Sequence, residues 1–173
     1  MSGRFATPMP DTYFRFASRE DVPVLLALIR ELAEFEKLLD HVAADEATLS
    51  EALFGSRRVA EVVIAEIKGE PVGFAVFFHN LSTFVGRAGL YLEDLYVRPH
   101  ARNKGVGRSL IQFVAKLAVD RKCGRFEWSV LDWNTRAIEF YRSLGAVAMN
   151  EWTVQRVTGD ALQRLGNQVF PEI

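Results

Sequence analysis

The chain lacks several features on which particular classes of protein depend. Cys123 is its only cysteine, so an intrachain disulfide is excluded and we expect a cytoplasmic location. The three histidines (His41, His79 and His100) have no ligand spacing, so we expect no metal site. No apolar run approaches the ~18 residues of a membrane-spanning helix, and Met1–Pro10 lacks the apolar core of a signal peptide. We therefore expect no membrane contact.

An excess of either charge is also missing. Lys and Arg number 21 against 22 Asp and Glu, which gives a formal net charge of −1 and disfavours a protein that coats nucleic acid. The hydrophobic fraction of 49% and the charged fraction of 25% are those of an ordinary globular protein. The length of 173 residues fits one domain. We expect a flexible leader over residues 1–12 and a single domain over residues 13–173.

Hydrophobic periodicity predicts an α/β (α+β) fold. Apolar residues at helical spacing, strand-like alternation and turn residues predict the order strand, helix, helix, three strands, helix, strand, helix, strand. The expected ranges are, in that order, 13–17, 22–35, 45–53, 58–67, 72–81, 90–97, 105–122, 126–130, 134–144 and 146–157, with a last helical turn at 158–165. An antiparallel run followed by βαβ units predicts a mixed, curved, mostly antiparallel sheet flanked by helices.

A basic loop with two glycines is the sharpest local feature. Residues 98–108 read RPHARNKGVGR, contain four Arg or Lys and no acid, and join an expected strand to an expected helix. Gly105 and Gly107 allow close backbone approach, and the N–H groups at a helix start favour phosphate oxygens. A tight turn with solvated basic residues is the alternative interpretation. The Walker pattern is absent, and Leu110 stands where a dinucleotide fingerprint has its third glycine.

This loop and its surroundings resemble the GCN5-related N-acetyltransferase (GNAT) superfamily. The matching segments, which extend from about Tyr13 to Leu165, include Arg102-x-x-Gly105-x-Gly107 after Leu95-Tyr96-Val97, and Trp133-Asn134 through Phe140-Tyr141-x-x-x-Gly145-Ala146. Further segments are similar to the diamine (spermidine/spermine) acetyltransferases and their thialysine-acetylating relatives: Tyr91-Leu92-Glu93-Asp94, Asp132-Trp133-Asn134, Glu31-Leu32-Ala33 and Glu151-Trp152. The resemblance implies that residues 13–173 are one N-acetyltransferase domain with the GNAT acyl-CoA N-acyltransferase fold.

The resemblance also implies a cofactor, a substrate class and the residues that bind them. Acetyl-CoA, as a co-substrate, is assigned to Leu95, Tyr96, Val97, Arg102, Asn103, Lys104, Gly105, Val106, Gly107, Arg108, Asn134, Thr135, Arg136, Ala137 and Tyr141. A small cationic amine is assigned to Phe35, Glu36, Glu93, Glu127, Trp128, Ser129 and Glu151. With Asp94 and Asp132, the acids of this set could line one pocket for a polycation. Ser82-Thr83 stands where the polyamine enzymes tend to carry an acid, which leaves room for a shorter amine such as a lysine analogue.

Acetyl transfer from a thioester requires a deprotonated amine, a polarised carbonyl and a protonated leaving thiolate. Glu93 is the expected base, directly or through a water, and Tyr141 is the expected acid at the position where the superfamily's tyrosine donates to the departing sulfur. A surface glutamate and a core tyrosine are the plain alternatives. These residues predict direct attack of the amine on acetyl-CoA.

The same cofactor-binding loop is compatible with other functions. One alternative is the same chemistry on an amino acid, an aminoglycoside or a protein N-terminus, and another is a non-catalytic acyl-CoA-binding regulatory module. A regulatory module would keep the loop and lose the catalytic base and acid, whereas Glu93 and Tyr141 are both present here. Relatives in this subfamily are homodimers that place a C-terminal strand against the partner. We therefore expect a homodimer in which Glu151–Val157 completes the neighbour's site.

Overall fold

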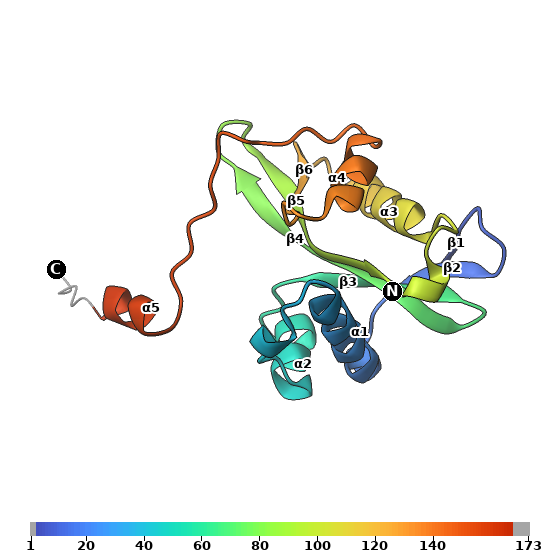
Figure 1. Cartoon of the computed structure of the whole chain (residues 1–173), viewed down its shortest axis with the longest axis horizontal. Helices are drawn as coiled ribbons and strands as arrows, with labels where there is room; N and C mark the ends of the chain where they lie inside the picture. Colours follow the sequence, from blue (N-terminus) through green and yellow to red (C-terminus); the bar gives the residue numbers. More distant parts are fainter. Residues whose placement is uncertain (1–2, 168–173) are drawn as a thin grey trace. The chain divides into compact units, whose positions relative to one another are not determined.

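The computed structural model describes residues 3–167, which form two compact units divided after Ser129. The first unit contains β1 (Arg4–Ala6), β2 (Thr12–Phe16), α1 (Val22–Phe35), α2 (Glu46–Phe54), β3 (Glu61–Ile67), β4 (Glu70–Ser82), β5 (Arg87–Val97), α3 (Val106–Asp120) and β6 (Phe126–Trp128). The second unit contains α4 (Thr135–Arg142) and α5 (Gly159–Gly166). Both sets of elements are labelled in Figure 1.

The first unit is built on a six-stranded sheet whose strands follow chain order from β1 to β6. Every neighbouring pair is antiparallel except β5 and β6, which are parallel. The antiparallel pairs β1–β2, β3–β4 and β4–β5 are joined by short connections, such as the turn between β3 and β4, where Gly69 has a φ of 85°. The antiparallel strands β2 and β3 are instead joined through α1 and α2. Helix α3 supplies the long crossover that the parallel pair β5–β6 requires. The expected mixed, mostly antiparallel sheet is confirmed.

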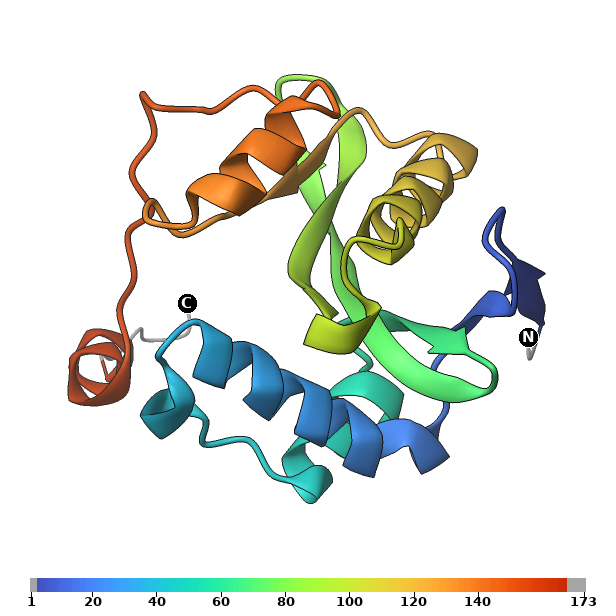
Figure 2. The ribbon, with the colours of Figure 1, turned by 45° about the vertical axis from the view of Figure 1, so that its right-hand side comes forward.

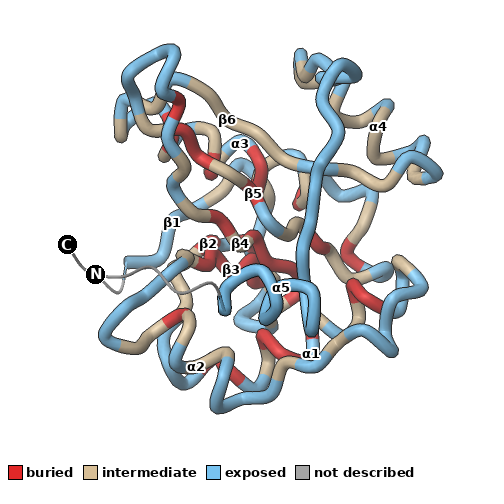
Figure 3. The backbone as a smooth tube through the Cα atoms, turned by 90° about the vertical axis from the view of Figure 1, so that its left-hand side faces the viewer, coloured by how far each residue is buried: buried red, intermediate tan, exposed pale blue. Residues whose placement is uncertain are grey.

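Helices cover both faces of this sheet, with α1 and α2 on one face and α3 on the other (Figure 2). On the first face the buried core consists of Leu25, Leu28, Leu32, Leu53, Val62, Ile64, Phe74 and Tyr96. On the other face Phe113 of α3 contacts the buried ring of Phe14, with centroids 5.6 Å apart. Because β3 is covered on both sides, residues Val62–Glu66 are buried without alternation (Figure 3).

Strand β5 contains a bulge at the residue expected to be the catalytic base. Its register with β4 passes from Val76↔Asp94 to Phe77↔Leu92, which leaves Glu93 as the extra residue. A bulge bends its strand and re-aims the side chains next to it. Glu93 is exposed, whereas Leu92 on the preceding position is buried.

The N-terminal segment differs from the expected leader. Arg4–Ala6 is strand β1, paired with β2 in the register Arg4↔Arg15 to Ala6↔Tyr13. The Phe5 ring lies 5.0 Å from that of Phe113 on α3. Side-chain packing and the β2 ladder thus order a segment that is too short and too polar for its alternation to be recognised in the sequence.

The second unit confirms two helices and corrects one strand. Helices α4 and α5 lie within the ranges 134–144 and 158–165, to within one residue. The expected strand at 146–157 is absent, because no strand of the described residues pairs with this segment. Its apolar side chains Val147, Met149, Trp152 and Val154 are between 61% and 82% exposed. Alternation alone therefore does not make a strand when the backbone has no ladder partner.

Candidate active site

The basic loop of residues 98–108 forms the start of α3, as its sequence predicts. Asn103 and Gly105 have positive φ angles of 62° and 84°, and Gly105 is the N-cap of α3. No side chain caps this helix, and its first helical hydrogen bond runs from Ser109 N–H to the Gly105 carbonyl at 2.9 Å. The N–H groups of the first turn, with the positive end of the helix dipole, suit a phosphate group.

Two arginines hold this loop to the rest of the first unit. Arg98 donates to both carboxylate oxygens of Glu31, at 2.7 Å and 3.1 Å, and to the Pro71 carbonyl at 3.0 Å. Arg102 Nε donates to the Val97 carbonyl at 2.7 Å. Glu31 lies on α1, so the entry to the loop is tied to that helix.

Arg102 also stacks on two aromatic rings. Its guanidinium carbon lies 4.9 Å from the ring centroid of Phe35 and 5.4 Å from that of Tyr96. Such cation–π contacts stabilise by about 0.5–2 kcal/mol. The resemblance assigns Arg102 to the cofactor and Phe35 to the substrate; the structure brings these two side chains together, and both assignments stay predictions.

The end of β5 next to the loop has a strand partner on one side only. Leu95, Tyr96 and Val97 pair with β4, whereas the β5–β6 ladder ends at Leu92↔Trp128 within the described part of the chain. A strand with one partner leaves half of its backbone hydrogen-bonding groups outside the ladder. This open edge adjoins the helix start, so an extended amide-containing ligand could bind along the strand with its phosphates at the loop.

Three carboxyl groups gather near the bulge of β5. Burial raises the pKa of Asp94 to about 6, with further contributions from the negative charges of Glu93 and Glu36. Burial also raises the pKa of Glu36, which is the C-cap residue of α1. The bulge and the end of α1 thus bring together Glu36, Glu93 and Asp94, three of the acids that the sequence analysis proposed for one pocket. This acidic cluster favours a cation.

The three predicted residues around β6 have other partners. Glu127 forms an ion pair with Arg125 at 2.8 Å and accepts a hydrogen bond from Asn80 Nδ2 at 3.2 Å. Its charge is therefore less available to an amine than the charges of the acidic cluster. Ser129 Oγ hydrogen-bonds the Tyr91 hydroxyl at 2.7 Å. Trp128 lies beside Phe126, with ring centroids 5.0 Å apart.

The second unit holds the remaining predicted residues. Asn134 caps α4, because its Oδ1 accepts a hydrogen bond from the Ala137 N–H at 3.2 Å. Thr135, Arg136 and Ala137 form the first turn of this helix. The half-buried Tyr141 lies one turn later, with its ring centroid 5.3 Å from that of Phe140, and Glu151 is exposed. Their roles in acetyl transfer stay predictions.

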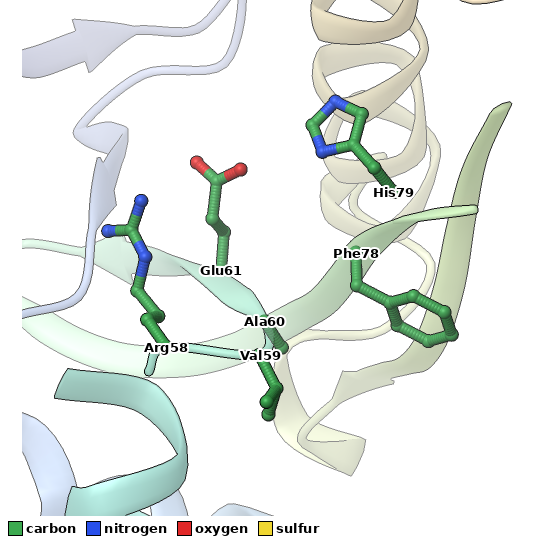
Figure 4. A pocket seen from close by; sticks show the side chains of 6 residues that line it. All are labelled: Arg58, Val59, Ala60, Glu61, Phe78 and His79. Carbon is green, nitrogen blue, oxygen red and sulfur yellow. The ribbon is translucent and has the colours of Figure 1, made fainter. Parts of the chain in front are cut away.

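One pocket of about 280 Å³ lies away from these residues, between the start of β3 and the middle of β4. It is lined by Arg58, Val59, Ala60, Glu61, Phe78 and His79, as shown in Figure 4. Glu61 is ion-paired with Arg121 at 2.5 Å, and although burial opposes it, this arginine lowers the pKa of the carboxyl. The charges of Arg58 and His79 also lower the pKa of Glu61, and none of the predicted site residues lines this pocket.

Two further observations concern the described residues as a whole. None of the helices over residues 3–167 combines the length and the apolarity that crossing a membrane requires. The same residues contain no group of three or more His, Cys, Asp or Glu that could hold a metal ion.

Comparison with known proteins identifies the family. Residues 26–146 match the model described as the Acetyltransferase (GNAT) family. The chain is 38% identical over 171 residues to a thialysine N-epsilon-acetyltransferase of Sus scrofa, covering 92% of this chain and 100% of that protein. It is 34% identical over 196 residues to an L-ornithine N5-acetyltransferase of Arabidopsis thaliana, covering 87% and 86%.

A solved structure agrees with this comparison. An integron cassette protein from the mobile metagenome of V. cholerae superimposes with a TM-score of 0.78 at 25% identity, over 91% of this chain and 99% of that one. The chain therefore belongs to the GNAT family, and it is an acetyltransferase that acts on amines.

Proposed function

We propose that this enzyme transfers the acetyl group of acetyl-CoA to a primary amine of a small cationic substrate, either polyamine-like or thialysine-like, by direct attack. The observation that carries the proposal is the acidic cluster of Glu36, Glu93 and Asp94 beside the open end of β5. The negative charges of Glu93 and Glu36 raise the pKa of Asp94, so a bound cation would offset that repulsion and favour the ionised form of Asp94. The named activities of the relatives, on thialysine and on ornithine, support a substrate with a terminal amine.

The residues of the first unit fit acetyl-CoA in two respects. The uncapped start of α3 offers N–H groups to the pyrophosphate, and the one-sided edge at Leu95–Val97 offers backbone groups to the amide-containing arm. When bound, acetyl-CoA supplies the thioester whose acetyl carbon accepts the amine. The chain itself has to orient the two substrates and move two protons.

Glu93 takes the first of these protons, directly or through a water. An alkylammonium has a pKa of about 10.4 and is protonated at neutral pH, so the amine becomes a nucleophile only after it loses a proton. The amine nitrogen then forms a bond to the acetyl carbon as the carbon–sulfur bond breaks. Tyr141 donates its phenolic proton to the departing sulfur, and the second proton that the nitrogen loses as the amide forms restores the Tyr141 phenol. The products are the N-acetylated amine, the free thiol of CoA and the proton held by Glu93.

Release of free thiol from acetyl-CoA tests this proposal against a panel of amines. The panel contains spermidine, spermine, putrescine, lysine, thialysine, ornithine, an aminoglycoside and a short peptide. We expect turnover on polyamines or on thialysine-like amines, strong loss of turnover in Glu93→Gln, and in Tyr141→Phe a larger loss in kcat than rise in KM. Asp120→Asn, at the exposed end of α3, is the control and should leave both constants unchanged.

Two results would overturn the proposal. Turnover of the aminoglycoside or the peptide alone would move the substrate to another class of amine. If no amine of the panel releases thiol although the protein binds acetyl-CoA, the result would instead indicate a regulatory acyl-CoA-binding module. Full activity of Tyr141→Phe would remove Tyr141 as the acid and leave the rest of the mechanism standing.

A further inference from the structure

The loop between β1 and β2 is held in a defined conformation by its own hydrogen bonds. Thr7 Oγ1 donates to the Thr12 carbonyl at 3.0 Å and accepts from the Met9 N–H at 3.2 Å. The Thr12 N–H donates to the Met9 carbonyl at 3.3 Å, which closes the loop. The Asp11 carbonyl accepts from the Lys68 N–H at 2.9 Å, so the loop is also tied to the turn between β3 and β4.

This ordered loop places Met9 against the glycine at the start of α3. A Cβ built on Gly105 would lie 3.2 Å from Met9 Sδ and 4.0 Å from Met9 Cγ, and Met9 supplies both of the atoms found within 4 Å of that point. Met9 is half-buried, although residues 8 and 10 on either side of it are exposed. Gly105 has the positive φ that shapes the helix start. The side chain therefore packs on the residue that shapes the proposed phosphate cradle.

We infer that Met9 is a positioning residue of the donor site, an inference that rests on the proposed function. Fixing the backbone of one residue opposes binding when that order has to be created as the ligand binds. Met9 holds Gly105 and the first N–H groups of α3 in place before the donor arrives. The β1–β2 hairpin thus forms part of the acetyl-CoA site, although it lies almost a hundred residues before the loop in the chain.

The contact predicts a specific effect on donor binding. Met9→Ala removes the packing on Gly105, so we expect the Kd for CoA and the KM for acetyl-CoA to rise about tenfold, the factor that corresponds to one ordered residue. Because Met9 is remote from the chemistry, kcat and the KM for the amine should not change. Met9→Leu keeps most of the packing volume and should restore donor binding.

A double-mutant cycle tests the contact itself. Gly105→Ala brings strain from the positive φ and a close approach to Met9 Sδ. Met9→Ala removes the second of these effects and leaves the first. We therefore expect Gly105→Ala to weaken CoA binding by a smaller factor in the Met9→Ala background than in the wild-type protein.

Isothermal titration calorimetry of the full chain with CoA measures the Kd. Steady-state kinetics and thermal unfolding show whether a change is specific to donor binding or reflects general stability. Val119→Ala, which truncates an exposed apolar side chain near the other end of α3, is the matched control. Wild-type affinity in Met9→Ala would overturn this inference and leave the proposed function intact. A lower melting temperature with rises in both KM values would also overturn it, in favour of general stabilisation. Failure of the wild-type protein to bind CoA would overturn the proposed function as well.

Discussion

Glu93 and Asp94 are adjacent in the chain but have different surroundings. Glu93 is exposed at the bulge of β5, whereas Asp94 is half-buried opposite Val76. Burial and the charges of Glu93 and Glu36 raise the pKa of Asp94 to about 6. A carboxyl group with this pKa is still partly protonated a little below neutral pH, so it can respond to a bound cation by releasing its proton.

The raised pKa of Asp94 predicts a pH-dependent cost in stability. The folded state binds this proton more tightly than the unfolded chain, where the pKa is 3.8, so stability decreases as pH rises from about 4 to about 6. Asp94→Asn removes the effect. We therefore expect this variant to gain stability relative to wild type as pH rises, by up to about 3 kcal/mol.

Urea unfolding at about pH 4 and about pH 7 measures this difference. Asp120→Asn, which changes an exposed carboxyl on α3, should show no such trend. A stability difference between Asp94→Asn and wild type that is the same at both pH values would show that the pKa of Asp94 is not raised.

The individual site residues differ in how far the sequence could predict them. Glu36 and Glu93 were assigned through the resemblance to the acetyltransferases, and the structure brings them together with Asp94. The pairing of Glu127 with Arg125 and the contact of Met9 with Gly105 have no signal in the sequence. The first depends on the side-chain conformations of a residue in β6 and of the residue just before that strand, and the second joins residues that are 96 positions apart.

At the scale of elements, hydrophobic periodicity predicted the strands and helices whose apolar side chains pack against a neighbouring layer of the fold. Helix α1 shows this well, since its apolar stripe of Leu25, Leu28 and Leu32 packs on the sheet. Strand β1 and the segment 146–157 depend instead on whether a neighbouring strand is present. That depends on tertiary structure, which explains why one was missed and the other was expected in error.

An ion-pair network joins three of these elements. Arg15 of β2 donates to both carboxylate oxygens of Asp21, which precedes α1, and to Glu66 of β3, with all three contacts at 2.7 Å. Glu66 is only 3% exposed and also pairs with Arg4 of β1, at 2.7 Å. The Arg4 side chain is 56% exposed, compared with 24% for Arg15. The two arginines therefore differ in how far their charge is removed from water.

This difference predicts unequal effects of removing each arginine. Arg15→Met leaves two buried carboxylates without their main partner, so we expect a loss of about 3–5 kcal/mol in the free energy of unfolding. Arg4→Met removes an exposed arginine and leaves Glu66 paired with Arg15, so this variant should lose about 1 kcal/mol or less. Urea unfolding of both variants measures the contrast. Equal losses would show that the network does not depend on burial.

The hydrogen bonds of Asp21 add a pH dependence to the same network. Although burial opposes it, the bonds from Arg15 and Ser18 lower the pKa of Asp21 below 3.8. Its stabilisation is present above that pH and is lost as the pH falls through the lowered value. The destabilisation caused by Arg15→Met should accordingly shrink in strong acid.

At the scale of the whole molecule, the apolar segment 146–157 has no ladder partner among the described residues. Val154 and Trp152, both about three-quarters exposed, would gain a partner if a second copy supplied a strand. We propose a homodimer that uses this segment. Sedimentation equilibrium should then give about twice the chain mass of 19.5 kDa.

A charge in the same segment should weaken such a dimer. Val154→Lys is expected to shift the mass toward that of the monomer, because a buried unpaired ammonium opposes association. Val119→Lys, on the exposed part of α3, is the control. If sedimentation equilibrium gives a mass of 19.5 kDa for the wild-type protein at all concentrations, the homodimer is contradicted.

The bulge at Glu93 also determines which changes of length β5 can accept. Leu92 lies opposite Phe77, whose ring is 5.8 Å from the Arg121 guanidinium next to α3, whereas Tyr96 lies opposite Phe74 in the core under α1. Leu92 and Tyr96, four positions apart, serve opposite layers only because the bulge lies between them. Deleting one residue between them would give the odd spacing that places two side chains on opposite faces of a regular strand. The strand can therefore lose Glu93, and the bulge with it, while Leu92 and Tyr96 keep their layers, whereas a deletion outside the bulge would turn the following side chains to the wrong face.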